Sequence, residues 1–296
     1  MKTEAATLSA GGSRFADFLA LTKPRLNSLV IVTTGVGYVL GSTGRFDYLG
    51  FLHTLVGSAL VAGGAAALNQ VAERDIDQAM ERTRRRPIPT GRLNPGEARV
   101  FGVVLAAIGV LQLVLGANML AAIVALATCV SYVAIYTPLK RRTQWATVVG
   151  AVPGALPVVI GWAAAHGDLG VEAWSLFGIV FLWQLPHFHA LAWIYREDFR
   201  RAGLPLMAVV DRDGRRNAMH ALAYSVLLLP VSLTPTLIGL TGRFYAGAAF
   251  GFGVAFVILA RRFADEQSPT RARSLFVGSL VYLPLLWGLL VADSVF

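Results

Sequence analysis

The chain is poor in charged residues and has almost no cysteine. Only 15% of its 296 residues are Asp, Glu, Lys or Arg, against about 25% in typical soluble domains. Together with a hydrophobic content of 55% and a mean hydropathy of +0.60, this excludes an ordinary soluble protein and indicates a membrane protein. The single cysteine, Cys129, excludes a disulfide framework within the chain, and the apolar run around it predicts a packing role.

The N-terminus lacks the uninterrupted apolar core of a signal peptide, because Glu4 and Asp17 break it. In its place, residues 14–21 bring together three large apolar side chains, which predicts a short helix at the membrane interface. We therefore expect residues 1–24 to form a cytoplasmic N-terminal segment. Residues 25–296 are expected to form a single transmembrane domain.

Nine apolar segments are long enough to cross a bilayer as helices. The sequence therefore predicts an all-α, polytopic membrane protein with nine transmembrane helices. The expected spans are residues 25–42, 50–70, 98–116, 119–137, 146–165, 173–194, 218–239, 245–261 and 274–293.

The basic residues are distributed very unevenly between the connections. All of the 26 lysines and arginines except Arg45 and Arg243 fall in the N-terminal segment or in connections on the same side of the predicted spans. The positive-inside rule then places the N-terminus in the cytoplasm and the C-terminus outside an inner or plasma membrane. The net charge of +9 is explained by this topology, so we expect the lipid bilayer and no nucleic acid as a partner.

A polar stretch follows the apolar run Val56–Leu68 without a break. Asn69, Glu73 and Asp77 are spaced four residues apart, so on a helix they share one face over two turns. Carboxylate and amide oxygens are ligands that suit Mg²⁺, which often shares phosphate oxygens of a substrate. The spacing favours a metal–diphosphate site with these three residues as ligands; the alternative is a solvated polar loop.

Basic side chains surround this stretch in the sequence. Arginines form charge-assisted contacts with phosphate oxygens, although a cytoplasmic loop would carry them for topology alone. Lys140 precedes a Gly- and Pro-rich span and is expected to reach a diphosphate from the opposite wall, as a catalytic residue beside the three ligands. The candidate diphosphate-binding residues are Arg25, Arg74, Arg82, Arg85, Lys140 and Arg141.

A second polar cluster closes the span 173–194. If it faces the first cluster, a central cavity opens toward the cytoplasm. His187 and His189 lie two residues apart, so an ideal helix points them in different directions. General acid–base work, contact to an aromatic substrate and haem iron ligation all remain open. Glu197 and Asp198 either hold a second Mg²⁺ or pair with neighbouring arginines. The candidate acceptor-side residues are Tyr136, Trp183, His187, His189, Glu197 and Asp198.

Several motifs together resemble the UbiA-type intramembrane prenyltransferases. These are LTKPR, the Asn69–Glu73–Asp77 spacing with the trailing RTRRRP, YTPLKRRT, and WQLPHFHALA followed by EDFRRAGLPL. Within that superfamily they are most similar to the haem O synthases, the branch that farnesylates protohaem IX. The resemblance implies nine helices around a central cavity, Mg²⁺ as cofactor, and farnesyl diphosphate and haem B as substrates. It also implies water addition to give haem O, and a downstream haem A synthase as a partner.

Two departures from the superfamily pattern bear on the acceptor. Glu73 stands where Asp is usual, which lengthens this ligand by one methylene. The second motif is not the DxxxD of quinone-making relatives, since the His187–His189 region occupies its upstream position, and this favours haem. A prenyltransferase for a quinone or chlorin, a secondary transporter and a haem-binding scaffold remain as alternatives.

Overall fold

Every segment expected to cross the membrane forms a long helix in the computed structural model, which describes residues 13–295. Much of the N-terminal segment expected over residues 1–24, including Glu4, lies outside the described residues. The long helices are α2 (Pro24–Gly41), α3 (Tyr48–Ala72), α5 (Pro95–Gly116), α8 (Ala146–His166), α9 (Val171–Ile194), α12 (Arg215–Ser232), α14 (Arg243–Asp265) and α15 (Pro269–Val295). One further long segment joins α6 (Met119–Val130), the π-helix η1 (Ser131–Tyr136) and α7 (Thr137–Leu139).

Five short helices complete the part of the chain that the structure describes, in which no strand occurs. They are α1 (Arg14–Leu21), α4 (Arg74–Ala79), α10 (Arg196–Arg201), α11 (Met207–Val210) and α13 (Thr234–Leu237). Helix α1 covers the same residues as the short helix expected from the sequence. Asp47, Asn94 and Asn118 cap the starts of α3, α5 and α6 by accepting backbone N–H groups, which explains where these helices begin.

Eight of the helices within residues 13–295 are long and apolar enough to cross a membrane, one fewer than the nine spans expected. The difference is α2, which forms a helix where a span was predicted but is less apolar. Arg25 and Asn27 in its first turn lower its hydropathy, and it lies against α8 and α3. The all-α, polytopic architecture predicted from the sequence is therefore confirmed.

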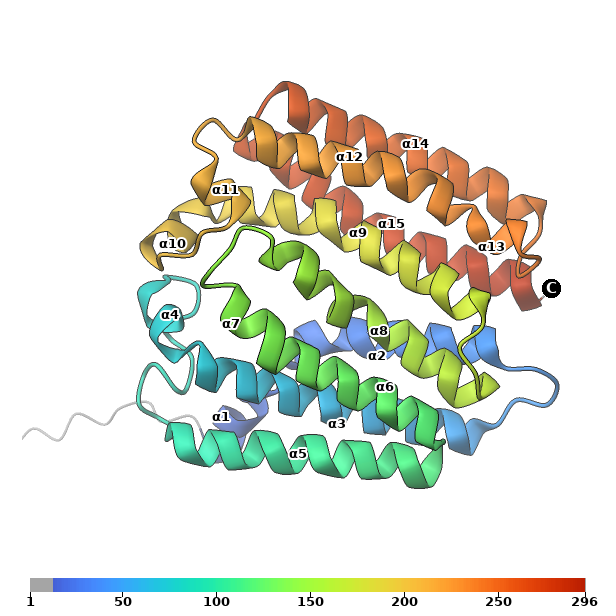
Figure 1. Cartoon of the computed structure of the whole chain (residues 1–296), viewed down its shortest axis with the longest axis horizontal. Coiled ribbons are helices and arrows are strands. Elements are labelled where there is room, and N and C mark those ends of the chain that lie inside the picture. The colour runs from blue at the N-terminus through green and yellow to red at the C-terminus, as the bar shows by residue number, and fades with distance from the viewer. Residues whose placement is uncertain (1–12, 296) are drawn as a thin grey trace, which may run out of the picture.

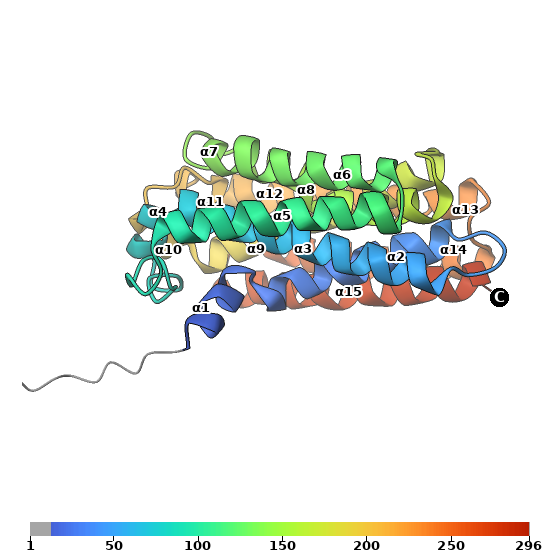
Figure 2. The ribbon, with the colours of Figure 1, turned by 90° about the horizontal axis from the view of Figure 1, so that it is seen from below.

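The long helices lie side by side with roughly parallel axes (Figure 1). The short helices α4, α10 and α11 gather at one end of this bundle, while α13 and the C-terminus lie at the other (Figures 1 and 2). The connections after α3 and α9 therefore meet at the same end. This arrangement brings together polar segments that are more than 100 residues apart in the sequence.

Two small apolar clusters hold these connections in place. One joins Leu21 of α1 to α3 and to the segment after Arg86, through Ile88 and Leu93. The other packs Ile76 and Met80 against the α10–α11 region. Burial of such side chains is worth roughly 1.5–3 kcal/mol each, so the polar groups between the two clusters are held on a fixed backbone.

Candidate functional site

Asn69, Glu73 and Asp77 share one face in the structure, as their spacing predicts. Helix α3 ends at Ala72, but the turn of chain continues: the N–H of Glu73 donates to the carbonyl of Asn69 at 2.9 Å, and the N–H of Asp77 donates to that of Glu73 at 2.8 Å. The three side chains are only 2%, 3% and 0% exposed. Buried carboxylates are costly unless they are paired, so the identity of their partners decides what this face can do.

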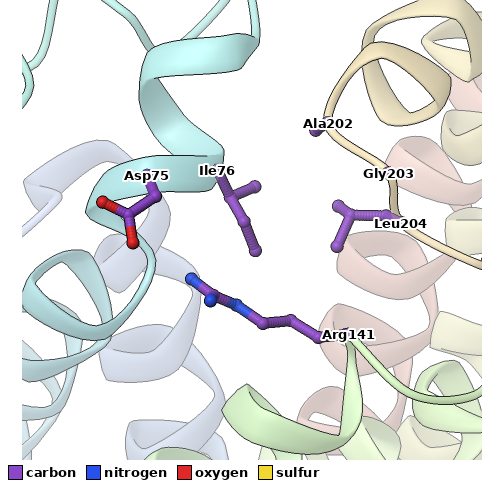
Figure 3. Close-up of a pocket in the computed structure, with 6 residues that line it drawn as sticks. All are labelled: Asp75, Ile76, Arg141, Ala202, Gly203 and Leu204. Carbon is purple, nitrogen blue, oxygen red and sulfur yellow. The ribbon is translucent and has the colours of Figure 1, made fainter.

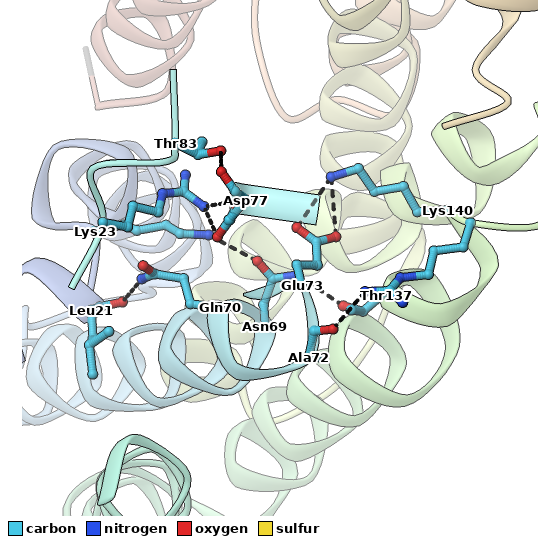
Figure 4. A network of polar contacts seen from close by, with 12 residues as sticks. Leu21, Lys23, Asn69, Gln70, Ala72, Glu73, Asp77, Thr83, Thr137 and Lys140 are labelled. Atoms are coloured by element: carbon cyan, nitrogen blue, oxygen red, sulfur yellow. Dashed lines mark hydrogen bonds and ion pairs between the residues drawn. The ribbon is translucent and has the colours of Figure 1, made fainter. Parts of the chain in front are cut away.

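Three cations that lie far apart in the sequence converge on this acidic face. Lys140 Nζ donates to both carboxylate oxygens of Glu73, at 3.1 and 3.3 Å. Arg86 holds both oxygens of Asp77 with one nitrogen, at 2.8 and 2.7 Å. Lys23 Nζ donates to Asn69 Oδ1 at 2.9 Å (Figure 4). Each oxygen donor expected to bind a metal therefore already has a positively charged group beside it.

Thr137, the first residue of α7 directly after the π-helix η1, fixes the orientation of the Asn69 amide. Asn69 Nδ2 donates to Thr137 Oγ1 at 3.1 Å, and that hydroxyl donates to the carbonyl of Tyr132 at 2.8 Å. Single π-helical turns are rare and often mark functional sites. Here the turn carries Tyr132 and Tyr136, whose rings stack with centroids 5.5 Å apart. The Asn69 carbonyl oxygen is thus turned toward Lys23 by a contact on its other side.

Lys23 has an unusual backbone and an unusual environment. Its φ of 49° and ψ of 57° are left-handed, and no other non-glycine residue within residues 13–295 has a positive φ. That conformation costs roughly 1–2 kcal/mol for a residue with a Cβ. Burial lowers the pKa of Lys23 to about 7; the Arg86 charge adds to the lowering, while Glu73 and Asp77 oppose it. An anion arriving beside this amine favours the ammonium form.

The arginines expected to bind a diphosphate lie around this site and not on its acidic face. Arg25, Arg74, Arg82, Arg85 and Arg141 are all exposed. Arg74 pairs with Asp75 at 3.4 Å, the Arg82 guanidinium lies 5.3 Å from the Tyr195 ring, and Arg141 donates to the carbonyl of Ala72 at 3.0 Å. Among the described residues, none of these five hydrogen-bonds a side chain of the three expected ligands.

Two cations of the site were missed by the sequence prediction. Lys23 lies within the LTKPR motif, and Arg86 is the last arginine of RTRRRP, so both belong to stretches that the sequence singled out. Of the three cations on the acidic face, only Lys140 was predicted as a site residue. The missing information is long-range: nothing in the spacing says which arginine folds back onto Asp77.

A cleft of about 260 Å³ lies beside the site at the same end of the bundle. It separates α4 from the connection between α10 and α11 and is lined by Asp75, Ile76, Arg141, Ala202, Gly203 and Leu204 (Figure 3). Figure 3 shows the Arg141 side chain extending across its floor toward Asp75. Asp75, which is not on the acidic face, therefore borders this cleft instead.

The second polar cluster is split between two sides of α9. His187 Nδ1 lies 2.7 Å from Ser279 Oγ on α15, and its ring stacks on Trp183 at 5.4 Å. His189 points to α12, where Nδ1 lies 2.8 Å from Asn217 Oδ1. The two histidines therefore do not share a face.

The tautomer of His189 follows from its partner. Asn217 Nδ2 donates to the carbonyl of His189 at 3.1 Å, so the Oδ1 atom is the one that faces the imidazole. Because Oδ1 can only accept, Nδ1 of His189 carries the proton and Nε2 keeps its lone pair. Nε2 is buried and has no hydrogen-bond partner within the described residues. A neutral imidazole nitrogen with a free lone pair can accept a proton or ligate a metal ion.

Glu197 and Asp198 are both engaged by neighbouring arginines. Arg200 donates to both oxygens of Glu197 at 2.7 Å, and Arg201 pairs with Asp198. No group of three or more His, Cys, Asp or Glu side chains suited to a metal occurs within residues 13–295. Any second metal site here would first have to displace these arginines.

The side-chain oxygen atoms of Asn69, Glu73 and Asp77 are suitable ligands for Mg²⁺. They are hard oxygen ligands, buried, and on consecutive turns of one face, and Mg²⁺ completes such a set with water or phosphate oxygens. The charges of the two carboxylates are balanced by the guanidinium of Arg86 and the ammonium of Lys140.

The chain matches known proteins over most of its length. The sequence profile of the UbiA prenyltransferase family matches residues 30–290. A protein of Solibacter usitatus named protoheme IX farnesyltransferase is 46% identical over 94% of this chain and 98% of that protein. One of the same name from Opitutus terrae is 43% identical over 98% of both chains.

Two solved structures share the fold. A structure described in terms of digeranylgeranylglyceryl phosphate synthase in membranes has a TM-score of 0.80 at 16% identity, covering 95% of this chain and 99% of its own. A UbiA homolog from Archaeoglobus fulgidus bound to GPP and Mg²⁺ has a TM-score of 0.70 at 15% identity, covering 93% and 99%. At these low sequence identities, the two structures support the fold and no particular activity. The profile and the near-full-length relatives show that the chain belongs to the UbiA prenyltransferase family.

Proposed function

We propose that the chain transfers the farnesyl group of farnesyl diphosphate to a vinyl group of protohaem IX, with addition of water, giving haem O and diphosphate. The observation that carries this proposal is the 46% identity, over nearly the full length, to a protein named protoheme IX farnesyltransferase. The buried acidic face with its three cations supports it, because these groups suit a metal–diphosphate donor.

The reaction forms one carbon–carbon and one carbon–oxygen bond, and it breaks the C1–O bond of the donor and one O–H bond of water. The allylic C1–O bond of the donor breaks, and diphosphate leaves with the bonding electrons. The vinyl electrons form the new bond to C1, which leaves a cation next to the porphyrin ring. Water adds there and loses a proton. Stabilising the charge that develops on the leaving group lowers this barrier most directly.

The donor side is assigned to Asn69, Glu73, Asp77 and Lys140. Mg²⁺ bound by the first three would neutralise the diphosphate and hold it against the acidic face. Lys140 and Arg86, which contact the carboxylates of Glu73 and Asp77, would donate hydrogen bonds to the phosphate oxygens of a bound donor. The exposed side chains of Arg25, Arg74, Arg82, Arg85 and Arg141 form an outer ring of positive charge that attracts the anionic donor.

The acceptor side is assigned to the second cluster and to η1. Tyr136, stacked on Tyr132 beside Lys140, offers an aromatic face to the allylic cation. The free Nε2 of His189 suits either ligation of haem iron or removal of the proton from water. His187 is half-buried and its ring, which stacks on the buried Trp183, is the one assigned to contact with a flat ring. Glu197 and Asp198 are assigned to a second metal only if Arg200 and Arg201 release them.

We infer from the charge distribution that these events occur at the cytoplasmic end of a protein of the inner or plasma membrane. The connections around the acidic face carry most of the basic residues, which the positive-inside rule assigns to the cytoplasm together with the N-terminus. The C-terminus then lies outside. A downstream haem A synthase is the partner that would consume haem O, a link that rests on the family resemblance.

The test is a reaction with purified protein in detergent, supplied with haem B, farnesyl diphosphate and Mg²⁺. The haem is then extracted and weighed by mass spectrometry. We expect haem that is heavier by one farnesyl group and one water. Released diphosphate with unmodified haem would turn the proposal toward a quinone or chlorin acceptor. Neither modified haem nor released diphosphate, in the presence of Mg²⁺, would favour a transporter or a haem-binding scaffold.

A further inference from the structure

The backbone conformation at position 23 does not explain why a lysine stands there. Its left-handed conformation is one that glycine adopts without strain, and the following Pro24 restricts the position further. Strained residues of this kind are kept where the surrounding structure holds them and where they serve a site. The reason for a lysine here has to lie in what its ammonium group contacts.

The ammonium of Lys23 contacts a neutral group. Its one hydrogen bond within the described residues goes to the amide oxygen of Asn69, at 2.9 Å. The two carboxylates of the site are already paired, Glu73 with Lys140 and Asp77 with Arg86. Lys23 is therefore the cation of this site that has no anion in contact, although it lies in the same network (Figure 4).

Counting charges shows what would complete the site. Lys23, Arg86 and Lys140 outnumber the carboxylates of Glu73 and Asp77 by one positive charge. A bound Mg²⁺ raises that excess to three, which matches the three negative charges of a fully ionised prenyl diphosphate. Without Lys23 the bound state would keep one uncompensated negative charge in a buried site, where such charges are costly.

We propose that Lys23 binds the diphosphate of the prenyl donor directly, and that α1 is the element that positions it. The proposal rests on the proposed donor site and adds a third cationic ligand to Lys140 and Arg86. On binding, the Lys23 ammonium exchanges the Asn69 amide oxygen for a phosphate oxygen, which leaves that amide oxygen to the metal.

The backbone before Lys23 is fixed by the helix that carries the acidic face. Gln70 Nε2 donates to the carbonyl of Leu21 at 2.8 Å, and Gln70 is the neighbour of Asn69 on α3. Leu21 is fully buried, and Arg92 pairs with Asp17 of α1 at 3.0 Å. Gln70 is thus a positioning residue for Lys23. The same turn of α3 carries Asn69, an expected metal ligand, and Gln70, whose hydrogen bond holds the end of α1.

Calorimetric binding of inorganic diphosphate in the presence of Mg²⁺ tests the proposal. Lys23→Met keeps most of the length of the side chain and removes its charge; we expect its affinity for diphosphate to fall by about 10-fold or more. Lys23→Arg should recover most of the affinity. Arg99→Met removes one exposed charge from the same side of the molecule and should bind like the wild type.

Thermal unfolding separates binding from folding. Lys23→Gly relieves the left-handed strain, so its midpoint should not fall, yet it should lose diphosphate affinity as Lys23→Met does. Wild-type affinity in Lys23→Met would overturn the proposal, and so would loss of affinity that follows a lowered midpoint and is not recovered by arginine. In either case, farnesylated haem made by the wild type would leave the proposed function standing. Failure of the wild type to bind diphosphate would remove both.

Discussion

Asp77 is the carboxylate on which the donor site depends most, because its side chain is fully buried and both oxygens are engaged by Arg86. We expect Asp77→Asn to lower the rate of haem farnesylation by more than the roughly 10- to 100-fold typical of groups that only support a metal ligand. The amide keeps the size of the side chain but removes the charge that a divalent cation requires. Steady-state turnover in detergent measures the loss.

The matched control for this change lies two residues away on the same helix. Asp75 has the same side chain but is 74% exposed and borders the cleft, so Asp75→Asn should keep near-normal turnover. Both variants should insert into the membrane and elute like the wild type. Full activity in Asp77→Asn, or equal losses in the two variants, would remove the metal-ligand assignment of Asp77.

At the residue scale, local spacing was enough to predict that the three expected ligands share a face, but not which residues contact them. Asn69, Glu73 and Asp77 share a face because helical geometry requires it, and this was predictable. Arg86 reaches Asp77 only because the chain turns back after α4, where Thr83 Oγ1 donates to the Asp77 carbonyl at 2.9 Å. Lys23 contacts Asn69 from a segment that lies 46 residues earlier in the chain. Such contacts depend on tertiary folding, which no periodicity in the sequence reports.

At the scale of elements, the long helices were predictable because apolar length leaves few alternatives in a membrane. The span expected over residues 173–194 is α9, Val171–Ile194, and that expected over 146–165 is α8, Ala146–His166. The π-helix η1 was not predictable, since it differs from an α-helix by one hydrogen-bond step. The breaks that separate α4 from α3 and α10 from α9 were also missed, and so was α11, because tertiary packing defines them.

Helices α2 and α8 cross so closely that glycine is required on both. A Cβ on Gly161 would collide with the carbonyl oxygen of Thr34, and one on Gly37 with that of Val158. We expect Gly161→Ala to lower the free energy of unfolding by about 1–3 kcal/mol or more, because the two backbones have to separate. Loss of helical circular dichroism on heating in detergent measures the change.

Gly247 of α14 provides the control for this helix contact. Nothing lies within 4 Å of a Cβ built there, so Gly247→Ala should be neutral or slightly stabilising, by up to about 1 kcal/mol. If Gly161→Ala melts like the wild type, the close α2–α8 crossing is wrong. Because Lys23 and Pro24 stand at the start of α2, that result would also weaken the positioning of the site.

At the scale of the whole molecule, charge distribution ties the fold to the site. Arg45 and Arg243 are the only basic residues assigned to the outer side, and the acidic face lies among the rest. The resemblance to the UbiA family, inferred from motifs spread over the chain, is confirmed by the profile match and by near-full-length relatives. The assignment of the two ends to the two sides of the membrane is still a prediction from charge.

Single cysteines at the two ends of the bundle test that assignment. Cys129 is buried and can be replaced by serine to give a cysteine-free chain. Arg142 and Arg243 are exposed in connections at opposite ends. In intact cells, a membrane-impermeant maleimide should label Arg243→Cys, whereas Arg142→Cys should react only after the membrane is made permeable. The reverse labelling pattern would mean that the orientation in the membrane is inverted and that the acidic face lies outside. Farnesyl diphosphate made in the cytoplasm would then not reach it directly, so the topology argument and the proposed donor route would both be wrong.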